Sequence, residues 1–186
     1  MKVLGISTSP RKGGNTEILI AEALQGALSK GAEIEFVTLA GKDIRPCLAH
    51  AECGKGASCL VHDDLIAVQE KMAAADAIIF GTPIYFGSMC SQAKILIDRT
   101  YYLAKSGRKL ENKVGGVIAV GGRAGHEFTT ATIMDFMTLQ GIALPPKAFA
   151  HALVRDLGAA KQDEKALKEA FALGERVAGM ALKLKS

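Results

Sequence analysis

Short apolar segments alternate with amphipathic helical segments along the whole chain, and this alternation most limits the possible folds. Extended segments, two of which run on into loops, are expected at residues 3–7, 32–40, 76–86, 113–125 and 148–154. Helical spacing of apolar residues predicts helices over residues 15–31, 63–75, 91–105, 126–141 and 164–185. Such an alternation gives parallel strands joined by right-handed crossovers, with helices on both faces of the sheet. The sequence therefore predicts an α/β, doubly wound, three-layer fold with a five-stranded parallel sheet.

The composition is that of an ordinary globular domain, which we expect to span residues 1–186. Hydrophobic residues make up 49% of the chain and charged residues 23%, and the length is sufficient to bury a core. The net charge of +4 is spread along the chain, which favours small anionic ligands over nucleic acid. Neither a signal-peptide pattern nor an apolar run of membrane-spanning length is present. We therefore expect a cytoplasmic protein that contacts neither membrane nor nucleic acid.

The loop after the first predicted strand, GISTSPRKGGNT at residues 5–16, combines hydroxyl, glycine and basic residues directly before a helix. Free N–H groups and a partial positive charge at a helix N-terminus stabilise an anion, and glycines let the backbone approach it. The patterns GxxxxGK[ST] and GxGxxG are missing, so the loop suits a phosphate monoester better than a nucleoside triphosphate or a dinucleotide. The alternative is a serine-capped helix after a flexible turn. The candidate binding residues are Ser7, Ser9, Pro10, Arg11, Lys12, Asn15 and Thr16.

Two further loops, after the third and fourth predicted strands, are expected at the same edge of the sheet. The first, GTPIYFGSMCSQAK at residues 81–94, offers a stiff turn with apolar and aromatic groups that can lie against a flat heteroaromatic ring. The second, VGGRAGHEFTT at residues 120–130, has glycines that leave room for a planar ligand. For Tyr85 and Phe86, packing on a neighbouring helix or subunit is the alternative. The candidates for ring contact are Thr82, Pro83, Ile84, Tyr85, Phe86, Gly87, Gly121, Gly122 and Gly125.

Three stretches of the chain resemble the NADPH-dependent FMN reductase family of flavodoxin-like proteins: GISTSPRKGGNTEILIAEAL, GTPIYFGSMCSQAKILIDR and the VGG-x-x-G loop. The similarity extends over about residues 1–141 and is greater to the iron-sulfur flavoproteins of anaerobic microbes. The resemblance implies bound FMN, with its phosphate in the first loop and its ring against the other two loops. It also implies NAD(P)H as co-substrate and a homodimer or homotetramer whose subunits meet near the flavin.

A compact run of cysteines, PCLAHAECGKGASC at residues 46–59, lies in a cysteine-rich loop at about residues 45–62. The iron-sulfur flavoproteins carry four cysteines there, spaced C-x2-C-x2-C with the last a few residues later, whereas this chain has a histidine in the second place. A [4Fe-4S] cluster with one imidazole ligand, a zinc site and a metal-free loop with oxidisable thiols are all compatible with this pattern. The candidate metal ligands are Cys47, His50, Cys53 and Cys59.

These features lead to the hypothesis of an FMN-dependent NAD(P)H oxidoreductase that takes electrons from a small-molecule or protein donor and passes them to an acceptor. The flavin carries the chemistry, so we assign no catalytic side chain. The alternative is a non-catalytic electron shuttle or redox sensor that uses FMN and the Cys/His loop. A hydrolase or transferase is disfavoured because no nucleophile and base stand at a recognised spacing. We expect structural or surface roles for His62, His126 and His151, and a small buried role for Cys90.

Overall fold

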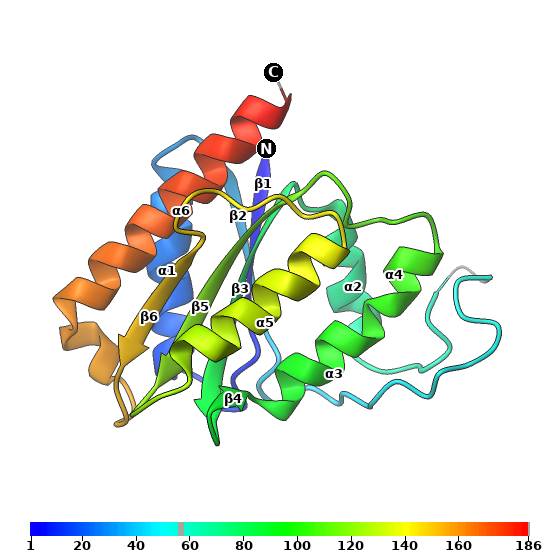
Figure 1. Cartoon of the computed structure of the whole chain (residues 1–186), viewed down its shortest axis with the longest axis horizontal. Helices are drawn as coiled ribbons and strands as arrows, with labels where there is room; N and C mark the ends of the chain where they lie inside the picture. The colour runs from blue at the N-terminus through cyan, green and yellow to red at the C-terminus, as the bar shows by residue number, and fades with distance from the viewer. Residues whose placement is uncertain (56–57, 186) are drawn as a thin grey trace.

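The structure, a computed structural model, describes residues 1–55 and 58–185 (Figure 1). Gly56 and Ala57, within the predicted cysteine-rich loop, and Ser186, at the end of the predicted domain, lie outside the described residues. The elements are β1 (Lys2–Ser7), α1 (Asn15–Leu28), β2 (Glu33–Thr38), α2 (Leu65–Ala74), β3 (Ala77–Tyr85), β4 (Ser88–Met89), α3 (Ser91–Arg99), α4 (Tyr101–Lys105), β5 (Val114–Gly121), α5 (His126–Leu139), β6 (Phe149–Leu153), the 3-10 helix η1 (Ala159–Gln162) and α6 (Glu164–Lys185).

Five parallel strands form the sheet in the order β2-β1-β3-β5-β6, which confirms the predicted parallel sheet. This is the doubly wound order of flavodoxin-like folds, in which the winding reverses next to the first strand. The two-residue strand β4 pairs antiparallel with the end of β3 and brings the number of strands to six. The chain therefore leaves β1 and β3, which are neighbours, at the same edge of the sheet.

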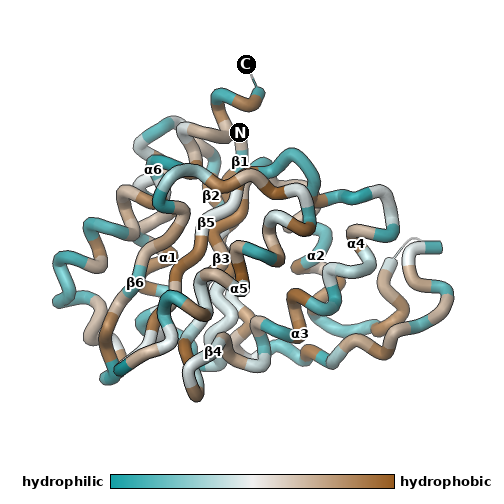
Figure 2. The backbone as a smooth tube through the Cα atoms, in the orientation of Figure 1, coloured by the Kyte–Doolittle hydropathy of each residue, from teal (hydrophilic) through white to brown (hydrophobic). Residues whose placement is uncertain are grey.

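Two hydrophobic cores cover the two faces of the sheet, because side chains alternate along each strand. Val3 of β1 belongs to the core under α1 and α6, whereas its neighbour Leu4 belongs to the core under α2, α3 and α5. Figure 1 shows these helices on opposite sides of the sheet. Figure 2 shows hydrophobic residues along the central strands and hydrophilic residues on stretches of the surrounding helices. Among the described helices, none is both long and apolar enough to cross a membrane.

Two local features differ from the sequence-based expectation. The single helix predicted over residues 91–105 is divided at Thr100, whose hydroxyl donates to the Ile97 carbonyl at 2.7 Å and competes with the regular helical bonds. The hairpin between β3 and β4 was not predicted. Its two turn residues, Phe86 and Gly87, have positive φ angles of 50° and 80°, the combination that a tight two-residue hairpin turn requires. Phenylalanine is a poor sequence signal for such a turn.

Helices α1 and α6 approach each other so closely that glycine is required at the contact. A Cβ atom added to Gly174 would lie 1.7 Å from the carbonyl oxygen of Ala23, and one added to Gly26 would lie 2.0 Å from that of Phe171. Both neighbours are backbone atoms, which cannot move aside as a side chain can. The closing helix α6 is therefore fixed against α1, whose first residues begin at the sheet edge where the first loop lies.

We expect Gly174→Ala to lower the free energy of unfolding by about 3 kcal/mol, because the methyl group forces the two helices apart. Gly179→Ala is the matched control in the same helix, since nothing lies within 4 Å of its added Cβ. This control should be neutral or stabilise by up to about 1 kcal/mol through helix propensity. Urea unfolding followed by circular dichroism measures both values. Equal stability of the two variants would contradict the close contact of α1 and α6.

Candidate functional site

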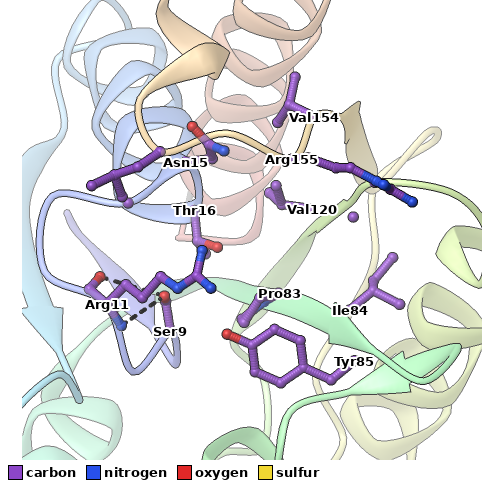
Figure 3. A pocket seen from close by; sticks show the side chains of 14 residues that line it. Ser9, Arg11, Asn15, Thr16, Pro83, Ile84, Tyr85, Val120, Val154 and Arg155 are labelled. Atoms are coloured by element: carbon purple, nitrogen blue, oxygen red, sulfur yellow. Dashed lines mark hydrogen bonds between the residues drawn. The ribbon is translucent and has the colours of Figure 1, made fainter.

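A cleft of about 190 Å³ lies at the carboxyl ends of the central strands, where the doubly wound topology predicts a ligand (Figure 3). Four segments contribute to it: the first loop with the start of α1, the end of β3, the end of β5, and the loop after β6. The cleft is lined by Ser9, Arg11, Gly14, Asn15, Thr16, Pro83, Ile84, Tyr85, Val120, Gly121, Gly122, Val154, Arg155 and Leu157.

The first loop presents an uncapped helix end to the cleft. Gly14 occupies the N-cap position of α1, and no side chain of the described residues forms a capping hydrogen bond there. The serine-capped helix that was the alternative interpretation is therefore not found, and the first N–H groups of α1 are left for an anion. The Ser9 hydroxyl oxygen instead accepts a hydrogen bond from the backbone N–H of Arg11 at 3.1 Å, which holds the turn. Figure 3 shows Arg11 and Thr16 facing the same space, with the Tyr85 ring across from them.

Asn15 connects the first loop to the loop after β6. Its side-chain amide donates to the carbonyl oxygen of Asp156 at 2.8 Å, and its oxygen accepts from the N–H of Ala160 at 3.1 Å. The sequence predicts that Asn15 binds the phosphate, but both polar atoms of its side chain already have partners within the protein. The effect is to hold the segment that carries Arg155 and Leu157 at the rim of the cleft.

The opposite wall combines apolar side chains with glycines. Pro83 is buried, Ile84 is half-buried and Tyr85 is 41% exposed. A Cβ on Gly121 would lie 3.0 Å from the Cβ of Ile84, and one on Gly122 would lie 2.2 Å from the Cγ of Arg155. Side chains at either glycine would therefore push into the groups that shape the wall, as expected for a site that accepts a flat ring.

Several predicted residues lie next to the cleft but do not line it. Phe86 and Gly87 are at the exposed tip of the β3–β4 hairpin, and Gly125 packs against that tip, where its added Cβ would be 2.5 Å from the Gly87 oxygen. Thr82 is buried and donates to the Pro83 carbonyl at 2.9 Å. Ser7, Pro10 and Lys12 belong to the loop at residues 5–16. The predicted residues outside the lining are Ser7, Pro10, Lys12, Thr82, Phe86, Gly87 and Gly125.

The fourth segment of the cleft, the loop after β6, was not predicted from the sequence. Val154, Arg155 and Leu157 follow β6, which the sequence predicts only weakly near residues 148–154. Because this strand is parallel to β5, its carboxyl end reaches the same edge of the sheet. The loop after it was therefore a candidate by the same rule that identified the others. With Arg155 present, the rim of the cleft carries two exposed arginines, Arg11 and Arg155.

Cys90 and the histidines have the structural roles expected from the sequence. Cys90 is buried and its thiol donates to the carbonyl oxygen of Thr8 at 3.2 Å. His126 bonds to the Ala152 carbonyl at 3.0 Å and His151 to the Thr130 hydroxyl at 2.8 Å, so both join α5 to β6. Burial, and then the neighbouring His126, lower the pKa of His151. His62 is exposed.

The four candidate metal ligands come together in the cysteine-rich loop between β2 and α2. Cys47, His50, Cys53 and Cys59 line one small cavity, which Arg99 of α3 also lines. Burial raises the pKa of the Cys53 thiol, and so do the nearby Cys59 and Cys47. All four cysteines of the chain are free thiols. Within the described ranges 1–55 and 58–185, no three His, Cys, Asp or Glu side chains are close enough to hold one metal ion.

Comparison with known proteins gives one family and several relatives. Residues 1–154 match the family model described as NADPH-dependent FMN reductase. An iron-sulfur flavoprotein of Methanocaldococcus jannaschii is 39% identical over 186 residues, with 96% of each chain covered. An iron-sulfur flavoprotein of Methanosarcina thermophila is 40% identical over 144 residues, which cover 76% of this chain and 75% of the relative.

Among solved structures, the crystal structure of RosB with a bound riboflavin phosphate intermediate superposes with a TM-score of 0.85 at 22% identity. The superposition covers 100% of this chain and 80% of the RosB chain. A flavodoxin from the Archaea gives a TM-score of 0.67 at 18% identity, with 100% of both chains covered. These two likenesses show that the fold is flavodoxin-like.

Proposed function

Because the chain belongs to the NADPH-dependent FMN reductase family, we propose that its cleft binds FMN, with the phosphate on the first loop and the ring between the ends of β3 and β5. The protein is an FMN-binding oxidoreductase of the NAD(P)H-dependent kind. The observation that carries the placement of FMN is the uncapped N-terminus of α1 beside Arg11.

The first loop suits a phosphate group for electrostatic reasons. Free N–H groups at the start of α1, the Ser9 and Thr16 hydroxyls and the Arg11 guanidinium all lie at one end of the cleft. A phosphate monoester carries close to two negative charges at neutral pH and accepts several hydrogen bonds through its oxygens. We propose that Arg155, whose side chain lies beside Gly122, contributes a positive charge on the ring side of the cleft.

The rest of the cleft suits the flavin ring. Pro83, Ile84 and Tyr85 give an apolar wall, and Gly121 and Gly122 beside them add no side chain of their own to it. Backbone N–H and C=O groups of a pocket wall can bond the polar edge of such a ring. FMN, when bound, supplies the ring that accepts hydride from reduced nicotinamide and passes electrons to an acceptor. The chain's own contribution is to orient that ring, to shield it from water and to leave one side open to a partner.

We also propose that Cys47, His50, Cys53 and Cys59 hold a [4Fe-4S] cluster. Three thiols and one imidazole are a chemically suitable donor set, and they line one cavity. Relatives that align with the chain at 39% and 40% identity are named iron-sulfur flavoproteins. Such a cluster, when bound, supplies one-electron transfer.

The surroundings of the cleft favour a partner near the flavin. Tyr85 is 41% exposed, and Phe86 beside it is fully exposed at the hairpin tip. Large apolar groups in this position are typical of an interface. We propose that a second copy of the chain covers them in a homodimer or homotetramer, and that the electron donor and acceptor are small molecules or proteins. We place the protein in the cytoplasm, where free thiols stay reduced.

Arg11→Ala should weaken FMN binding about 10- to 100-fold, because one charge-assisted hydrogen bond to the phosphate, worth about 1.5–3 kcal/mol, is lost. Lys12→Ala is the matched control: its side chain is also basic and exposed but does not line the cleft. We expect its effect to stay below about threefold, as for a screened surface charge. Quenching of FMN fluorescence by the apoprotein gives both dissociation constants. Equal losses in the two variants would argue against phosphate binding at Arg11.

Protein purified without oxygen should contain roughly four iron atoms and four acid-labile sulfides per chain. If His50 is a ligand, His50→Cys should keep the cluster and lower its reduction potential, because imidazole ligation raises the potential relative to thiolate. His62→Ala, at an exposed histidine at the end of the same loop, is the control and should change neither quantity. One zinc per chain without sulfide, or no metal, would contradict the cluster. Equal potentials in wild type and His50→Cys would contradict ligation by His50.

A further inference from the structure

We propose that Arg99, the last residue of α3, holds the cysteine-rich loop in place and donates its Nε–H to the Cys59 sulfur when that sulfur ligates the cluster. Arg99 is thus assigned as a positioning residue for the metal site. The inference rests on the proposed cluster.

The guanidinium of Arg99 joins the two ends of the loop. Its Nη1 donates to the carbonyl oxygen of Arg45 at 2.9 Å, and its Nη2 donates to that of Val61 at 2.8 Å. Arg45 precedes Cys47 by two residues, and Val61 follows Cys59 by two residues. One side chain from α3 therefore fixes the backbone on both sides of the run that carries the four candidate ligands.

A buried ion pair reinforces this junction. Arg99 forms two parallel hydrogen bonds to the carboxylate of Asp63, 2.7 Å to Oδ2 and 3.0 Å to Oδ1, and both side chains are fully buried. The same carboxylate accepts the backbone N–H of Arg45 at 2.7 Å and that of Leu65 at 3.1 Å. A carboxylate with this many donors is ordered, and it ties the loop to the start of α2 as well as to α3.

Two hydrogen bonds between Asp43 and Asp64 join the chain just outside the two ends of the loop. The backbone N–H of Asp43 donates to the Asp64 carboxylate at 2.8 Å, and the N–H of Asp64 donates to the Asp43 carbonyl at 3.1 Å. The loop ends are thus joined by protein groups alone. Metal binding then has to order less of the chain than it would in an unconstrained loop, which favours binding.

One donor of Arg99 is left over. Its four Nη protons have the acceptors described above, whereas its Nε is buried and has no hydrogen-bond partner in the part of the chain that the structure describes. Arg99 lines the same cavity as the four candidate ligands, Cys59 among them. A buried guanidinium N–H without an acceptor is uncommon and calls for a specific explanation.

A metal-bound thiolate gives that explanation. A sulfur ligand of a cluster carries negative charge, and hydrogen bonds to the sulfurs are among the factors that set the reduction potential of such clusters. A cationic N–H beside the site stabilises the more negative, reduced form, which raises the potential. Residues that bond to metal ligands in this way affect metal affinity without touching the metal.

The test is Arg99→Lys in the full chain, purified without oxygen. Lysine keeps the positive charge opposite Asp63 but lacks the Nε–H. We expect unchanged FMN content, an iron and sulfide content at least about twofold below wild type, and a lower reduction potential for the cluster that remains. Lys94→Ala is the matched control, because Lys94 lies in the same helix and its side chain forms an exposed pair with Asp98. It should match wild type in all three measurements.

Wild-type iron, sulfide and potential in Arg99→Lys would overturn the role of Arg99 and leave the proposed cluster standing. A wild-type protein that binds FMN but contains no iron or sulfide would overturn both.

If Arg99→Lys does not fold, as judged by loss of FMN, the wild-type protein provides a second measurement. In protein labelled with nitrogen-15 arginine, a protected Nε–H signal should move when the metal-free protein is reconstituted with iron and sulfide. No change in any protected arginine signal would refute the proposal.

Discussion

The uncapped start of α1, at the carboxyl end of β1, is the constraint on which the candidate site depends. Backbone N–H groups at this position need acceptors, and no side chain of the first loop supplies one. The sheet order places the ends of β3, β5 and β6 around the same point, so an anion bound there lies beside the apolar residues of the cleft. The anion site at the start of α1 and the apolar part of the cleft together suit a ring that carries a phosphate. FMN is such a molecule, and the chain belongs to the NADPH-dependent FMN reductase family.

Helix α3 relates this cleft to the cysteine-rich loop. It begins after Cys90, whose thiol is bonded to Thr8 of the first loop, and it ends at Arg99, which holds the cysteine-rich loop. Nine residues of helix span about 13 Å. The two regions are therefore fixed to opposite ends of one short rigid element, and neither can shift far without the other. We regard this helix as the structural reason that a flavin cleft and a thiol-rich loop can keep a constant separation.

Much of this arrangement follows from local sequence pattern. The alternation of strands and helices fixes the parallel sheet, and hydroxyl, glycine and basic residues after β1 indicate the anion site. What local pattern does not reveal depends on contacts distant in sequence. Arg155 reaches the cleft because β6 lies beside β5, and Arg99 meets Asp63 across 36 residues. The turn at Phe86 was missed because its backbone conformation is unusual for a bulky residue.

The affinity of FMN compared with that of riboflavin, measured with the same apoprotein, tests the central claim most directly. The two ligands share the ring and differ in the phosphate. If the start of α1 and Arg11 hold the phosphate, two or more charge-assisted hydrogen bonds are lost with riboflavin, which amounts to about 3 kcal/mol or more. FMN should then bind at least about 100-fold more tightly. Equal affinities would contradict the account, because the first loop would then contribute nothing to binding.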